Sequence, residues 1–122
     1  MYDKEIVLDL LTNMIDASEK IIKRTSHIQS TDDFLKDDNS LILLDSTCMQ
    51  LIAIGEAVKK IDTLTNKELF KNYPNIPWRE VAGMRDIISH HYFDLNAGIV
   101  FDVVNEHIES LKDTLIEIKS SI

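Results

Sequence analysis

Arg85, His90 and Tyr92 form the spacing R-x-x-x-x-H-x-Y, and together they could act on a phosphodiester. An arginine keeps its positive charge at any working pH and can bind a phosphate in two places. A histidine titrates near neutral pH and can transfer a proton, whereas a tyrosine hydroxyl can donate, accept or attack. The three groups therefore suit RNA cleavage: one holds the phosphate, and another withdraws the proton of the 2′-hydroxyl or protonates the leaving oxygen. This scheme requires no metal ion.

Helical geometry complicates cooperation among these residues. The stretch 77–91 is predicted to form one helix, and on an ideal helix Arg85 and Tyr92, seven residues apart, are nearly in line. His90, by contrast, lies about 140° around the axis from Arg85 on a regular helix. Either the chain turns near His90, or a symmetric second copy of the protein completes the site. Asp86, four residues before His90, is expected to support it by hydrogen-bonding the imidazole.

Simpler interpretations exist for each of these groups. A lone arginine or histidine on a helix is usually part of a surface ion pair, and by composition alone that interpretation is favoured over catalysis. Glu56 precedes Lys59 and Lys60 by about one turn, so an ion pair within its own helix is the simplest expectation. His90 and His91 are adjacent and point about 100° apart, so they form no zinc motif.

The elements that must position these residues are predicted from apolar spacing. Only 3 Gly and 2 Pro interrupt the 122 residues, too few for the many turns of a β-sandwich or barrel. Four principal helices are expected, at Lys4–His27 (N-cap Asp3), Leu41–Ile61, Pro77–His91 and Ala97–Lys119 (N-cap Asn96). The sequence therefore predicts an all-α fold, an antiparallel four- to five-helix bundle in a single domain over residues 1–122.

Core packing is predicted on the first and last helices and at one glycine. The core stripe of the first helix is expected to be Ile6, Leu10, Met14, Ala17, Ile21 and Ile28, widened by Val7, Leu11 and Ile22. That of the last helix is expected to be Val104, Ile108, Leu111, Leu115, Ile118 and Ile122. Gly55 lies inside the second helix, where glycine costs roughly 1 kcal/mol relative to alanine. A small residue there is expected to let another helix approach closely.

Charge and composition limit the partners and the compartment. The formal net charge of −8 opposes nonspecific binding to RNA or to anionic membranes, so an RNA-directed role needs a local basic cleft or a basic partner. Cys48 is expected to be a buried core residue, and one cysteine cannot form an intramolecular disulfide. The acidic cluster at 31–40 is expected to cap helices, so neither a metal site nor a cofactor is predicted. The N-terminus lacks a signal peptide, and no apolar run reaches the ~20 residues that span a bilayer. A soluble cytoplasmic protein is expected.

Two motifs carry a resemblance to a known family. The segments I-G-E-A-V-K-K at 54–60 and P-W-R-E-V-A-G-M-R-D-I-I-S-H-H-Y at 77–92 resemble the HepT-like family of HEPN-domain proteins. The R-x-x-x-x-H-x-Y motif alone is moderately specific, and its place some twenty residues after I-G-E-A makes the resemblance stronger. In that family a helical-bundle toxin is encoded beside a small, MntA-like nucleotidyltransferase antitoxin.

The resemblance implies a metal-independent ribonuclease that acts as a homodimer, with RNA bound in a cleft at the dimer interface. Arg85 and His90 match the catalytic pair of the family, and Asp86 matches the polar residue after the arginine. Tyr92 matches the tyrosine that the partner enzyme modifies with AMP, which blocks the cleft. His91 fills a variable position and is assigned no role.

Three hypotheses about function follow. The first is a toxin-type endoribonuclease, with Arg85 on the phosphate and His90 as general acid or base. The second is a non-enzymatic helical dimer that binds the nucleotidyltransferase and accepts AMP on Tyr92. The third is a plain helical interaction module, in which these residues are scattered or held in local pairs.

Overall fold

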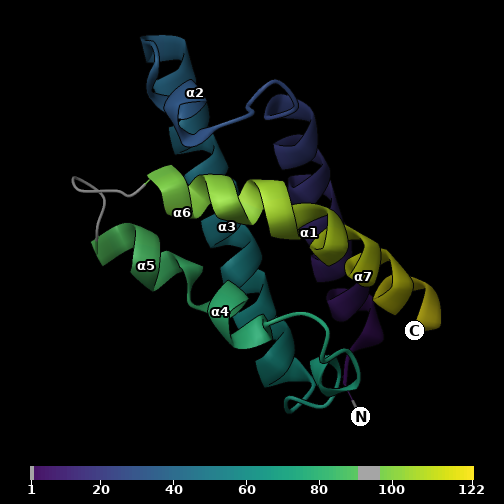
Figure 1. Ribbon diagram of the computed structural model, residues 1–122. Coiled ribbons are helices and arrows are strands. Elements are labelled where there is room, and N and C mark those ends of the chain that lie inside the picture. Colours follow the sequence, from purple (N-terminus) through teal and green to yellow (C-terminus); the bar gives the residue numbers. More distant parts are fainter. Residues whose placement is uncertain (1, 91–96) are drawn as a thin grey trace.

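The computed structural model describes residues 2–90, without the side chain of His90, and residues 97–122. Within these ranges the chain forms helices and no β-strand, which confirms the all-α prediction (Figure 1). The helices are α1 (Lys4–Arg24), α2 (Thr31–Leu35), α3 (Asp38–Leu64), the 3₁₀ turn η1 (Phe70–Asn72), α4 (Trp78–Ala82), α5 (Met84–His90), α6 (Ala97–Asp102), the π-helical segment η3 (Val103–His107) and α7 (Ile108–Ser121).

Helix α1 begins at Lys4, directly after the predicted N-cap Asp3. The face that it buries differs slightly from the predicted core stripe. The Asp3 carboxylate accepts hydrogen bonds from the backbone N–H groups of Glu5 and Ile6, at 3.0 and 3.3 Å. The fully buried positions include Val7 and Leu11, whereas Ile6, predicted to lie in the core, is 42% exposed. The buried face is thus centred about one residue further along, because α3 and α7 both pack against α1 and together select which face is covered.

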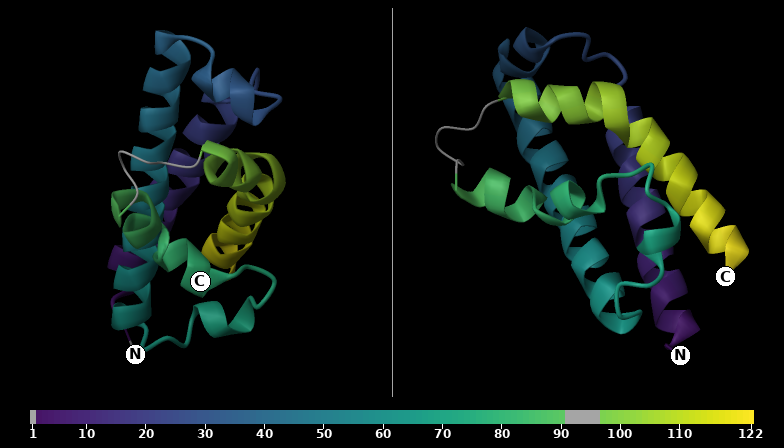
Figure 2. Two further views of the ribbon diagram at one scale, coloured as in Figure 1. Left: turned by 60° about the vertical axis from the view of Figure 1, so that its left-hand side comes forward. Right: turned by 60° about the horizontal axis from the view of Figure 1, so that its bottom comes forward.

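Helix α3 is the central element, with α1, α2, α4 and α5 packed along it (Figures 1 and 2). The carboxylate of Asp37 caps it by accepting from the Ser40 N–H at 2.8 Å. The helix starts and ends about one turn beyond the predicted bounds Leu41 and Ile61. By length and composition α3 could cross a membrane, a test that the core helix of a soluble protein also passes. Neighbours on several sides account for part of its apolar character, whereas Leu41, Ile42 and Met49 are exposed.

A stacked aromatic pair fixes the segment that leads into α4. The rings of Phe70 and Trp78 lie 3.9 Å apart at an interplanar angle of 19°. The Trp78 indole N–H also donates to the carbonyl of Tyr73 at 2.8 Å. These contacts anchor the start of α4 on the turn that precedes it.

The predicted helix Pro77–His91 was wrong in one respect, because it is divided at Gly83 into α4 and α5. The Gly83 N–H donates to the carbonyls of both Arg79 and Glu80, at 3.0 and 3.1 Å, which tightens the last turn of α4. Its ψ of −2° lies away from the regular helical value and marks the junction.

The predicted helix Ala97–Lys119 is likewise interrupted, by the π-helical segment η3. A π-helix bonds i to i+5 and so accommodates one more residue per turn than its neighbours. Figure 2 shows the helical rod changing direction where α6 passes into α7. Ile108, Leu111, Leu115 and Ile118 are buried as predicted, while Val104 is only half-buried.

Candidate ribonuclease site

The site depends on a close approach of α4 to α3 at Gly55. A Cβ placed on Gly55 would lie 2.6 Å from the carbonyl oxygen of Val81 and 3.4 Å from that of Ala82. The predicted close contact at this glycine is therefore confirmed, with α4 as the approaching helix. Because α5 follows α4 after one residue, this contact also brings α5 against α3.

Arg85 lies in the first turn of α5 and reaches across to α3. Its Nη1 is 3.0 Å from Oε1 of Glu56, the residue next to Gly55. Glu56 also forms the pair expected within its own helix, with Oε2 3.1 Å from the ammonium of Lys59. One carboxylate thus joins two cations from two helices, and the Arg85 side chain remains 58% exposed.

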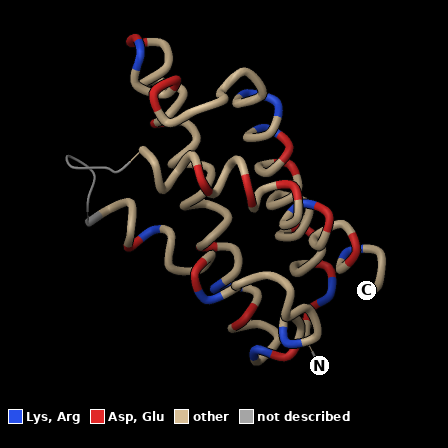
Figure 3. Tube along the Cα trace, in the orientation of Figure 1, with Lys and Arg blue, Asp and Glu red and all other residues tan. Residues whose placement is uncertain are grey.

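The charges around Glu56 keep it ionised. The Lys59 ammonium beside Oε2 lowers the pKa of the Glu56 carboxyl; desolvation opposes this, and Arg85 adds to the lowering. Glu56, Arg85 and Lys59 together carry one net positive charge, although the chain as a whole is acidic. Figure 3 shows Lys and Arg residues interspersed with Asp and Glu along the trace. A basic cleft must therefore arise from small local groupings such as this one.

Of the other predicted site residues, the structure describes Asp86 fully and the backbone of His90. His90 is the last residue of α5, five residues after Arg85, and its side chain lies outside the described residues. Asp86 lies on α5 and is exposed. Tyr92 and His91 lie outside the described residues. The structure joins Arg85 to Glu56, whereas the sequence suggested only an intrahelical pair for Glu56. The I-G-E-A segment contained this residue, but nothing in its spacing pointed to Arg85.

A hollow of about 450 Å³ lies between α3 and α5, lined by Asp45, Cys48, Met49, Ile52, Ile88 and Ser89. The residues from α3 recur at steps of three and four, so they share one face of the helix. Met49 is 64% exposed and Ile42, one turn before Asp45, is also exposed. On this face of the central helix Ile42 and Met49 are exposed, Ile52 is half-buried and Cys48 is buried.

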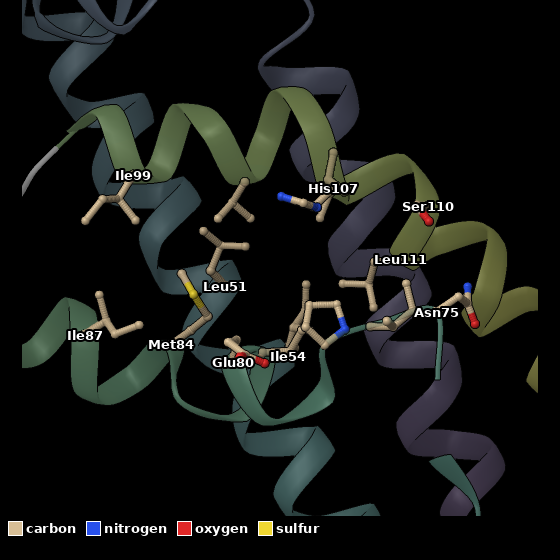
Figure 4. A pocket seen from close by; sticks show the side chains of 15 residues that line it. Leu51, Ile54, Asn75, Glu80, Met84, Ile87, Ile99, His107, Ser110 and Leu111 are labelled. Carbon is tan, nitrogen blue, oxygen red and sulfur yellow. The ribbon is translucent and has the colours of Figure 1, made fainter. Parts of the chain in front are cut away.

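A second cavity, of about 310 Å³, lies between helices α4 and α5 on one side and the continuous rod of α6, η3 and α7 on the other. Figure 4 shows Ile99 and His107 on one side, facing Met84, Ile87 and Glu80 on the other. Its lining is mainly apolar. His107, for which the sequence predicted no role, lies at the end of η3.

No group of three or more His, Cys, Asp or Glu side chains within the described ranges is arranged to hold a metal ion. Cys48 is buried, as predicted, and burial raises the pKa of its thiol to about 11, with the nearby carboxylate of Asp45 contributing in the same direction.

Comparison with known proteins identifies the family of this chain. A family model described as "Ribonuclease HepT-like" matches residues 14–118, a span that includes Glu56, Arg85 and His90. No significant match to a solved structure was found.

Three relatives are similar over most of their length. A protein of Caldanaerobacter subterraneus subsp. tengcongensis, named provisionally as an RNase, is 34% identical over 108 residues, covering 88% of this chain and 89% of the relative. The "Probable ribonuclease HepT" of Thermococcus cleftensis is 36% identical over 104 residues, 85% of this chain and 87% of the relative. The "mRNA nuclease HepT" of Shewanella oneidensis is 24% identical over 130 residues, 92% of this chain and 98% of the relative. On the family match and these identities, the chain belongs to the HepT-like ribonuclease family.

Proposed function

We propose that this chain is a metal-independent endoribonuclease in which Arg85 binds the scissile phosphate and His90 is the general acid or base. One observation carries the proposal: an exposed guanidinium is held at a defined place on the same seven-residue helix as His90, inside the span that matches the ribonuclease family. Only Nη1 of Arg85 bonds to Glu56, so other N–H groups of the fork can bind a phosphate.

The active form is a homodimer. Arg85 and His90 share helix α5, and positions five residues apart on a regular helix lie about 140° around the axis from each other. A two-fold partner would bring the His90 of one copy toward the Arg85 of the other. The exposed apolar side chains of Ile42 and Met49, on the face of α3 beside α5, support an interface on this side of the molecule.

RNA cleavage by single variants tests the assignment. Arg85→Ala and His90→Ala are each expected to lower the cleavage rate by about 10²- to 10⁴-fold, the usual contribution of a positioned acid or base. Arg79→Ala, which removes an exposed arginine from α4, is the matched control and should cleave like the wild type. Circular dichroism should show unchanged helicity in all three. Full activity in a folded Arg85→Ala, His90→Ala double variant would refute the assignment.

Regulation would act through Tyr92. In the proposed system the chain is a cytoplasmic toxin, and an MntA-like nucleotidyltransferase antitoxin adds AMP to Tyr92. A bulky anionic group there would repel RNA phosphates from the cleft. Intact-mass measurement after incubation with ATP and such an enzyme should show a gain that Tyr92→Phe abolishes and Tyr73→Phe retains. If the chain gains no mass under any condition, this regulation is wrong.

The net charge of −8 favours a second candidate, a non-enzymatic dimer that serves only as partner and modification target of the nucleotidyltransferase. It predicts the same mass gain on Tyr92. It also predicts that purified wild-type protein and the Arg85→Ala variant leave RNA equally intact, which separates it from the enzyme.

A further inference from the structure

Among the described residues, Glu56 forms the ion pair with Arg85, and it does so from a different helix. The two residues are 29 positions apart in sequence, and each oxygen of the Glu56 carboxylate faces a different cation. Oε1 accepts from Arg85, while Oε2, which is shielded from solvent, lies beside Lys59. This arrangement fixes the guanidinium and the ammonium next to each other on the surface.

The arrangement contributes little to the stability of the fold. All three side chains are more than a third exposed, and exposed ion pairs stabilise proteins weakly. Its effect on a bound phosphate would be larger. Arginine has a long, rotamer-rich side chain whose freedom is lost on binding, and a guanidinium already held in place has lost part of that freedom beforehand.

Lys59 adds a second positive charge at the same place. It lies one turn along α3 from Glu56, with its ammonium 3.1 Å from Oε2 of the carboxylate that also binds Arg85. Two cations against one carboxylate leave a net positive charge, and a phosphate that binds the free N–H groups of Arg85 would lie near the Lys59 ammonium. A compact, flexible ammonium is suited to neutralise a phosphate without fixing its orientation.

We propose that Glu56 is a positioning residue that holds Arg85 for catalysis, and that Lys59 is a second phosphate-binding residue of the same site. This inference rests on the ribonuclease function proposed above. It goes further by assigning roles to two residues on α3 that lie outside the R-x-x-x-x-H-x-Y motif.

Glu56→Gln tests the positioning role through a split between KM and kcat. The substrate is the RNA that wild type cleaves fastest in a pool of end-labelled oligonucleotides. Removing a negative charge beside the phosphate site should leave KM unchanged or lower it. The loss of a fixed Arg85 should nevertheless lower kcat by about 10- to 100-fold. Glu80→Gln, which removes the same charge from α4, is the control and should keep the wild-type kcat. If Glu56 merely repelled RNA, Glu56→Gln would raise kcat/KM without lowering kcat, and that result would overturn the positioning role.

Salt dependence of RNA binding tests Lys59 independently of catalysis. In a His90→Ala background, Lys59→Gln should reduce the slope of log K against log salt by about 0.7, the value for one phosphate contact on a single strand. Lys60→Gln removes the same charge about 100° further around α3 and should leave the slope unchanged. Equal slopes for Lys59→Gln and Lys60→Gln would exclude a specific contact by Lys59.

Different results would refute the ribonuclease function and the positioning role of Glu56. If the wild type neither binds nor cleaves RNA, or if Arg85→Ala cleaves as well as the wild type, the ribonuclease assignment and this inference both fall. If Arg85→Ala is inactive while Glu56→Gln has the wild-type kcat and KM, the ribonuclease assignment stands and the role of Glu56 is refuted.

Discussion

Replacing Gly55 by alanine should destabilise the protein even though alanine is the better helix former. The new Cβ would meet the carbonyl oxygen of Val81 at 2.6 Å, a backbone atom that cannot rotate away. To restore ordinary contact, α4 must retreat by about 0.8 Å, and forcing extra atoms into a packed contact costs about 1–3 kcal/mol. The gain in helix propensity offsets about 1 kcal/mol of this.

Gly83→Ala provides the matched control. A Cβ at Gly83 would lie 3.4 Å from the Arg79 carbonyl oxygen and 3.5 Å from that of Glu80, which is ordinary contact. Its φ of −81° suits alanine, so this variant should be stabilised by up to about 1 kcal/mol. The two glycine variants should therefore differ in free energy of unfolding by up to about 3 kcal/mol.

Urea unfolding followed by far-UV circular dichroism measures this difference, at one fixed protein concentration because a dimer would make stability concentration-dependent. If Gly55→Ala unfolds at the same urea concentration as Gly83→Ala, the close contact between α3 and α4 does not constrain the fold. Gly55→Ala should also slow RNA cleavage, since a displaced α4 carries α5 and Arg85 away from Glu56.

Three further predictions concern other parts of the chain. Because burial raises the pKa of the Cys48 thiol to about 11, native protein should react with an aromatic disulfide reagent at least about 10-fold more slowly than urea-unfolded protein, and equally fast labelling without urea would contradict this. Trp78→Phe can still stack on Phe70 but loses the hydrogen bond to the Tyr73 carbonyl, so it should cost at least about 1 kcal/mol in urea unfolding followed by circular dichroism. Desolvation raises the pKa of Asp62, so the folded chain holds that proton more tightly than the unfolded chain and stability falls as pH rises through the carboxyl range. Asp62→Asn should consequently be more stable than wild type at neutral pH, with the difference vanishing in acid; an equal difference at both pH values would refute this.

Features set by neighbouring residues could be predicted from the sequence. Asp3 caps the first helix through N–H groups two and three residues away, so its role depends on local sequence alone. Gly55 was also informative, because a glycine inside a helix needs a packing reason. The choice between Ile6 and Val7 for the core was not predictable, since adjacent apolar positions are distinguished only by where α3 and α7 lie.

The Arg85–Glu56 pair could not be predicted for a related reason. Its partners are 29 residues apart, and their contact depends on how closely α5 crosses α3 and on the break at Gly83. The sequence offered Glu56 a nearer partner in Lys59, which it also uses. Local spacing therefore predicted the ion pair of Glu56 with Lys59. The ion pair of Glu56 with Arg85, which belongs to the candidate site, depends on the tertiary arrangement of the helices.

The π-helical segment η3 has a consequence for how the length of this chain can vary. Val100 and Ile108 are both buried, although residues eight apart on an α-helix point about 80° away from each other. The additional residue in the π turn takes up about one residue of rotation and returns both side chains to the same side. Residues 103–107 thus act as a one-residue insertion that the helix has absorbed. Deleting one residue there would give a continuous α-helix with both buried faces still aligned, so this is where we expect single-residue length differences among related chains.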